Sequence, residues 1–106
     1  MSRSPYPTPA PVARGVREVG DDLAIWRRLR RLTTAQVADR AGLSRRTVEN
    51  LERGQGATLE SVLRVARALG VLDLITKALD PYATDVGRLR SAESLPRRVR
   101  RPTAKR

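Results

Sequence analysis

A chain of 106 residues is long enough for one small domain and too short for two. Its formal net charge is +11, and residues 84–106 contain eight basic residues against two acidic ones, which predicts a polyanionic partner, most simply nucleic acid. The chain has no Cys and no His, which excludes disulfides, zinc fingers, and thiol or serine–histidine catalysis.

The remaining polar residues do not suggest an enzyme. The acids are scattered along helical patterns, and no glycine-rich phosphate loop with its Lys is present. We therefore expect no catalytic residue, no metal ligand and no cofactor. No apolar run approaches the roughly 18 residues of a membrane-spanning helix, and the N-terminus has prolines where a signal peptide needs a hydrophobic region. These features predict a cytoplasmic, nucleoid-associated protein without a membrane partner.

The first segment, residues 1–19, has proline at every second position from Pro5 to Pro11. That pattern opposes a helix and predicts a disordered, Pro-rich arm. A domain over residues 20–80 and a basic tail over residues 81–106 are expected to follow.

The domain opens with Leu23, Trp26 and Leu29 at three-residue spacing, which predicts a helix from about 21 to 31. Asp21 and Asp22 then fit the positive end of its dipole. We interpret Trp26, the only Trp, as a core anchor rather than as a ligand-stacking residue.

The stretch from Thr34 to Arg53 predicts a helix-turn-helix. Thr33 and Gln36 form a capping-box pattern at the start of one helix, and Gly42 stands where that helix must stop, since glycine takes a positive φ without a Cβ penalty. Ser44 is the next N-cap candidate. After it, one side of the second helix is apolar, with Val48 and Leu51, and the other is polar.

Two further helices complete the domain, which makes five in all and predicts an all-α fold. Residues 59–69 show the most regular amphipathic pattern, from Thr58 as N-cap to Gly70 as terminator. Residues 72–79 form a shorter helix that Pro81 prevents from continuing. Its apolar face is either a dimer surface or packs into the domain's own core.

Beyond residue 81 the apolar content falls, with one short turn expected near Thr84 and Asp85. Residues 97–106 contain six basic residues and are read as a solvated tail, a DNA-phosphate contact or a docking segment for a partner protein. Composition leaves these three roles open.

The combination of Thr33, Ala38, Gly42, Val48 and Leu51, with Glu52-Arg53-Gly54 after them, resembles the Xre/Cro/C1-type helix-turn-helix repressor family. The resemblance covers residues 20–79 and implies a five-helix domain that binds a palindromic operator in double-stranded DNA as a homodimer. It also implies a structural ion pair between Arg27 and Glu52. Where the family often has a phosphate-binding glutamine, this chain has Thr34. Residues 44–70 are most similar to Hip-type antitoxins, small repressors often encoded beside a kinase-like toxin.

In helix-turn-helix geometry, the second helix enters the major groove and its N-terminal residues meet base edges. The expected base-reading residues are Arg45, Arg46, Thr47 and Asn50. The expected phosphate contacts are Thr33, Thr34 and Arg53. One of the first two arginines could equally contact phosphate only, and Glu49 is either a negative discriminator or a surface charge.

The function predicted first is a sequence-specific transcriptional regulator, an autoregulatory repressor and an antitoxin candidate. The alternative is a protein-binding module that neutralises a toxin mainly through its tails. RNA binding is a third reading, but aromatic residues make up only 3% of the chain, so the usual stacking platform is missing.

Overall fold

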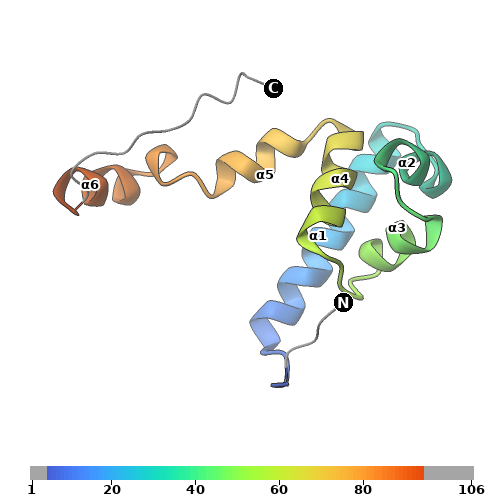
Figure 1. Cartoon of the computed structure of the whole chain (residues 1–106), viewed down its shortest axis with the longest axis horizontal. Helices are drawn as coiled ribbons and strands as arrows, with labels where there is room; N and C mark the ends of the chain where they lie inside the picture. Colours follow the sequence, from blue (N-terminus) through green and yellow to red (C-terminus); the bar gives the residue numbers. More distant parts are fainter. Residues whose placement is uncertain (1–4, 95–106) are drawn as a thin grey trace. The chain divides into compact units, whose positions relative to one another are not determined.

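The computed structural model describes residues 5–94, and all regular structure in that part of the chain is helical, which confirms the all-α class. In chain order the elements are α1 (Ala10–Leu29), α2 (Thr34–Ala41), α3 (Arg45–Glu52), α4 (Leu59–Leu69), α5 (Leu72–Ala78), the 3₁₀ turn η1 (Pro81–Ala83) and α6 (Asp85–Ser94) (Figure 1). Five of these α-helices, α1 to α5, end before residue 80, the expected end of the domain, and α6 follows in the segment that was expected to be a tail. The chain divides into two compact units, Met1–Asp73 and Leu74–Arg106.

Helix α1 begins much earlier than expected. It starts at Ala10 instead of residue 21, so the prediction of a disordered arm over residues 1–19 was wrong for residues 10–19. Pro11 is accommodated in the first helical turn, where a backbone N–H has no partner and a φ near −65° suits the helix. Only residues 5–9 are non-helical in the described part of this segment. Asp21 and Asp22 therefore lie well inside the helix, and their expected place at its N-terminal end was also wrong.

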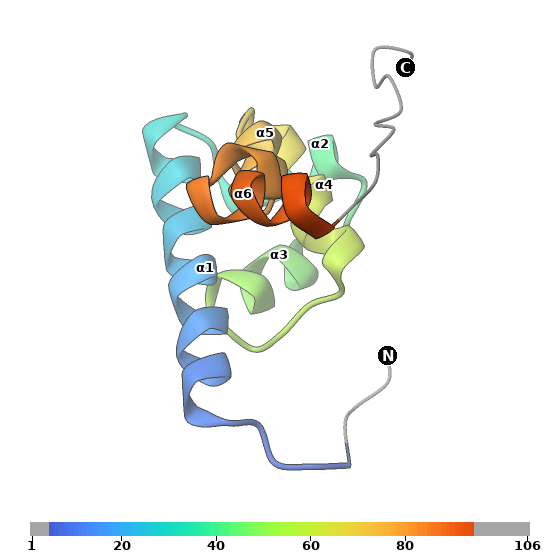
Figure 2. The same cartoon turned by 90° about the vertical axis from the view of Figure 1, so that its left-hand side faces the viewer.

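The first unit is built on α1 to α4. Helix α1 runs along α3 and α4, while α2 packs on both α3 and α4 (Figure 2). Every one of these helices contributes to the core. Its buried apolar side chains are Leu23, Ala24, Val37, Ala38, Ala41, Val48, Leu51, Val65, Ala66, Leu69 and Val71. Leu29, expected on the buried face of the first helix, is instead 66% exposed.

Local capping fixes where α2 begins and ends. The Thr33 hydroxyl accepts the Gln36 amide at 3.0 Å, and the Gln36 side chain accepts the Thr33 amide at 2.8 Å, which completes the capping box. Gly42 ends α2 in the left-handed conformation, with φ 71° and ψ 36°. The chain can therefore reverse between the two helices within three residues.

Similar signals set the ends of the next helices. The Ser44 hydroxyl accepts the Thr47 amide at the start of α3, and the Thr58 hydroxyl accepts the Ser61 amide at the start of α4. Gly70 ends α4 with φ 78°. Arg31, in the connection between α1 and α2, is the only non-glycine residue with positive φ in the described part.

The second unit differs from the first in the burial of its side chains. None of its residues from 74 to 93 is buried, and four of its apolar side chains are more than half exposed: Leu74, Leu79, Val86 and Leu89. Helix α6 packs on η1, and Gly87 allows this approach because a Cβ there would overlap the Pro81 carbonyl. The expected short turn after Thr84 is thus a helix that reaches Ser94. Residues 95–106, including the basic run, lie outside the described residues.

Candidate nucleic-acid interface

Helix α3 separates an apolar side from a polar side. Val48 and Leu51 are buried against the rest of the first unit, which fixes how the helix is rotated about its own axis. The opposite side faces solvent. Together with Gln55 it forms a shallow hollow of about 540 Å³, lined by Arg45, Arg46, Glu49, Asn50, Arg53 and Gln55. Three of the four predicted base-reading residues are therefore brought together on one surface.

Two of these residues are already paired. Nε of Arg45 lies 2.8 Å from Oε2 of Glu49, one helical turn further along α3. An exposed pair at this spacing is worth only about 0.3–0.5 kcal/mol. A guanine contact is worth about 1–3 kcal/mol, which is more than the pairing of Arg45 with Glu49 contributes. Glu49 is thus an intramolecular partner of the first base-reading candidate.

Thr47 lies apart from this group. Its amide donates to the Ser44 hydroxyl, and the two hydroxyl oxygens are 2.8 Å apart, so its side chain belongs to the N-cap of α3. It does not line the hollow. Base reading by Thr47 therefore has less geometric support than base reading by Arg45, Arg46 or Asn50.

The start of α2 offers backbone donors to an anion. The capping box occupies the amides of Thr33 and Gln36. The amides of Thr34 and Ala35 have no hydrogen-bond partner within residues 5–94. Free amides and the helix dipole together favour a phosphate at this position. The backbone donors at the start of α2 therefore do not depend on the glutamine side chain that the family often has there.

A bidentate ion pair between Arg27 and Glu52 joins α1 to α3. Nε and Nη2 of Arg27 donate to the two carboxylate oxygens of Glu52 at 2.7 and 3.0 Å, and the side chains are only 15% and 12% exposed. The hydrogen bonds that Arg27 donates to the Glu52 carboxylate raise the pKa of Arg27 above its ordinary value, although burial acts to lower it. Because the pKa is raised above its ordinary value, this stabilisation is present throughout the neutral and moderately alkaline range and is lost only as the pH rises through the folded-state pKa.

Other arginines also serve the fold, which the sequence did not indicate. Nε of Arg30 donates to the Leu69 carbonyl at 3.0 Å, and Arg30 lies over the Trp26 ring at 5.3 Å from its centroid. Arg64 donates to the Ala41 carbonyl at 3.1 Å. Each arginine thus satisfies a carbonyl at the C-terminal end of another helix. Trp26 is half-buried beneath Arg30 rather than fully enclosed in the core.

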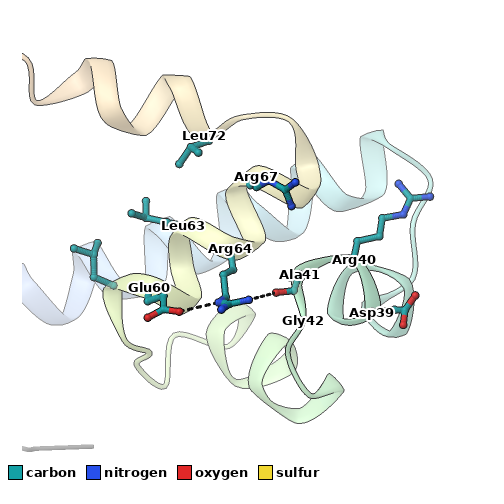
Figure 3. Close-up of a pocket in the computed structure, with 10 residues that line it drawn as sticks. Asp39, Arg40, Ala41, Gly42, Glu60, Leu63, Arg64, Arg67 and Leu72 are labelled. Carbon is teal, nitrogen blue, oxygen red and sulfur yellow. Dashed lines mark hydrogen bonds and ion pairs between the residues drawn. The ribbon is translucent and has the colours of Figure 1, made fainter. Parts of the chain in front are cut away.

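A larger hollow, of about 690 Å³, lies between the end of α2 and α4 (Figure 3). The Arg64 side chain lies between the two helices and bonds both Ala41 and Glu60, so its polar groups are used in packing (Figure 3). No group of three or more potential metal-binding side chains occurs within residues 5–94. In the same range, no helix combines the length and the apolar character needed to cross a bilayer.

Comparison with known proteins agrees with this geometry. The sequence model of a family described as "Helix-turn-helix" matches residues 23–74, which span all of α2, α3 and α4. No curated protein and no solved structure matches the chain. The matched family is one of DNA-binding regulators rather than enzymes. Residues 23–74 therefore resemble a helix-turn-helix domain of the Xre/Cro/C1 type, the kind of domain that DNA-binding transcription regulators contain.

Proposed function

We propose that this protein is an autoregulatory repressor that reads its operator directly with α3. The observation that carries the proposal is the exposed face of α3, where Arg45, Arg46 and Asn50 share one surface opposite the buried Val48 and Leu51. Arginine can form a fork onto guanine, and asparagine pairs with adenine. Within a domain of this family, such a surface is suited to base edges in the major groove.

The proposed binding unit is a homodimer on a palindromic operator. Two copies of α3 about 34 Å apart would read half-sites one DNA turn apart. The apolar side chains exposed on α5, directly after it and on α6, namely Leu74, Leu79, Val86 and Leu89, support association through the second unit. The residues from 74 to 94 carry three basic and three acidic side chains, so two copies can meet there without net repulsion.

The same exposed side chains support a second candidate, an antitoxin that binds a toxin through its C-terminal part. That role requires a toxin encoded beside this gene. Co-expression provides the test: the chain should relieve the growth inhibition caused by the neighbouring gene product. Relief that persists when α3 carries Arg45→Ala and Arg46→Ala would assign neutralisation to protein binding instead of repression.

Binding at fixed salt to the DNA upstream of the chain's own gene tests the first proposal. Arg45→Ala, Arg46→Ala and Asn50→Ala should each lose about 1–3 kcal/mol on the operator and much less on a variant that already lacks the cognate base. Arg67→Ala, at an exposed site on α4, is the matched control and should change neither value. Salt must be held constant because the electrostatic part of binding varies steeply with it.

The losses of binding free energy on the different base variants distinguish an arginine that reads a base from one that contacts phosphate. An arginine that contacts only phosphate would lose the same free energy on every sequence. If all three α3 substitutions behave in that way, α3 does not read bases directly, and specificity has to come from DNA shape.

A further inference from the structure

The first half of α1 lies outside the segment that matches the helix-turn-helix family, which begins at residue 23. Both views show this half projecting past α3 and the loop that follows it (Figures 1 and 2). It adds two arginines, Arg14 and Arg17, one helical turn apart. Residues 10–22 of α1 are therefore additional to the segment that matches the family.

Two close contacts hold the extension against the end of α3. At Gly20 the α1 backbone lies so near α3 that a Cβ would overlap the Leu51 carbonyl and lie 3.0 Å from that of Glu52. At Gly54, immediately after Arg53, a Cβ would lie 2.7 Å from Cγ and 3.0 Å from Cα of Arg17. The backbone and stem of Arg17 therefore pack directly on the residue that follows a predicted phosphate contact.

The charges of Arg14 and Arg17 are free for an outside partner. Both side chains are exposed, and neither forms an ion pair or a hydrogen bond within residues 5–94. This distinguishes them from Arg27, Arg30 and Arg64, which are engaged in the fold.

The position suits the sugar–phosphate backbone of DNA. In the proposed complex α3 lies in the major groove. Structure that adjoins the end of α3 therefore lies beside the strands that flank the groove. Arg14 and Arg17 are about 4.5 Å apart along α1, so their long side chains can reach two neighbouring phosphates of one strand.

We propose that Arg14 and Arg17 contact two phosphates beside the operator, so that α1 extends the DNA interface beyond the helix-turn-helix. The proposal rests on the proposed DNA-binding function and deepens it by assigning a second, sequence-independent contact. These arginines should set affinity and salt dependence without changing base preference.

The test uses the full chain with Arg14→Gln and Arg17→Gln together, because glutamine removes the charge and keeps most of the stem that packs on Gly54. The matched control is Arg40→Gln with Arg67→Gln. These exposed arginines on α2 and α4 line the hollow between those helices, and their replacement lowers the net charge equally. Affinity is measured against salt concentration on the operator and on an unrelated duplex.

The magnitude of the slope of log K against log salt should fall by about 1.8 in the α1 variant and stay unchanged in the control. If counterion release is the whole contribution, affinity at 0.15 M salt should fall about 30-fold, by the same factor on both duplexes. Arg14→Lys with Arg17→Lys, which keeps the charge, should retain most of the slope.

Equal salt slopes in the α1 and control variants would overturn the proposal, and so would a loss of affinity confined to the operator. It would also be overturned if the α1 variant loses its slope and melts at a lower temperature, and the lysine variant restores neither. That result would mean that the arginines hold α1 in place. If the unsubstituted chain shows no preference for its operator, the proposed repressor function fails, while the comparison of slopes on any bound duplex still decides whether Arg14 and Arg17 contact phosphate.

Discussion

Arginine is used in this protein in two different ways, to hold helices together and to form an exposed basic surface. Arg27 is held by Glu52 and is nearly buried, whereas Arg46 and Arg53 line an open surface on α3. Arg64 is an exposed residue, yet its Nη1 donates to the Ala41 carbonyl at the end of α2. Which use applies depends on the distance to another helix, so residues that look equivalent in sequence should respond differently to substitution.

Glu52 and Glu60 provide a direct comparison, since each carboxylate pairs with an arginine. The Glu52–Arg27 pair is nearly buried, whereas the Glu60–Arg64 side chains are 74% and 47% exposed. Glu52→Ala strands a poorly solvated guanidinium and should lower the free energy of unfolding by about 3 kcal/mol. Glu60→Ala should cost less than about 1 kcal/mol. Thermal or urea melts measure both, and equal losses would contradict the structural role of the Arg27 pair.

The turn between α2 and α3 depends on Gly42. Its φ of 71° is one that a β-branched residue tolerates badly, so Gly42→Val should lower stability by about 1–3 kcal/mol. The nearest atom to a new Cβ would be the end of the Arg64 side chain, at 3.0 Å, which can move. Backbone conformation therefore dominates the cost. Gly42→Asn is the control and should lose less, because asparagine enters the left-handed region more readily. Similar melting temperatures for the two variants would show that φ is not the cause.

At the level of the elements, local sequence signals were sufficient to predict where α2, α3 and α4 begin and end. Their caps lie within a few residues of the helix ends they control, so Thr33, Ser44, Thr58 and the terminating glycines could be recognised in the sequence. The start of α1 was missed because the disordered arm predicted from the prolines was taken to continue to residue 19. Pro11, however, lies in the first turn of α1, where a helix accepts proline. Contacts such as Arg30 to Leu69 join residues far apart in the chain, and no local pattern indicates them.

Helix α1 contains two interior glycines that should respond to substitution in opposite directions. Replacing an interior glycine by alanine favours a helix by about 0.5–1 kcal/mol. Gly15 has nothing within 4 Å of a new Cβ, so Gly15→Ala should stabilise the protein by about that amount. At Gly20 the new Cβ would meet the backbone of α3, so Gly20→Ala should destabilise it despite the gain in helix propensity.

Differential scanning calorimetry of these two variants measures how tightly α1 packs on α3. If Gly20→Ala raises the melting temperature as much as Gly15→Ala does, the close approach of α1 to α3 is absent in solution.

For the whole molecule, charge is distributed unevenly along the chain. Residues 1–73 have thirteen basic and eight acidic side chains, residues 74–94 have three of each, and residues 95–106 have six basic and no acidic ones. More than half of the net charge thus belongs to a segment outside the described residues. Total charge is consequently a poor measure of how strongly the helix-turn-helix itself attracts DNA.

We expect the basic segment 97–106 to contact phosphates without reading sequence. Replacing its six basic residues by glutamine, with the length retained, should lower the magnitude of the salt slope by up to about 5.4 and weaken binding to all duplexes alike. Affinity measured between 50 and about 200 mM salt gives the slope. A slope that does not change would leave docking of a partner protein or solubility as the function of this segment.

The absence of buried residues between positions 74 and 93 also has an evolutionary consequence. Substitutions there leave no cavity in a core, so selection can act on that segment for the partner it meets, with little penalty from folding. The helix-turn-helix unit, whose described core ends at Val71, can meanwhile keep its own packing. A gene of this design can thus acquire a new partner by substitutions in residues 74–93 while the packing of the helix-turn-helix unit is inherited intact.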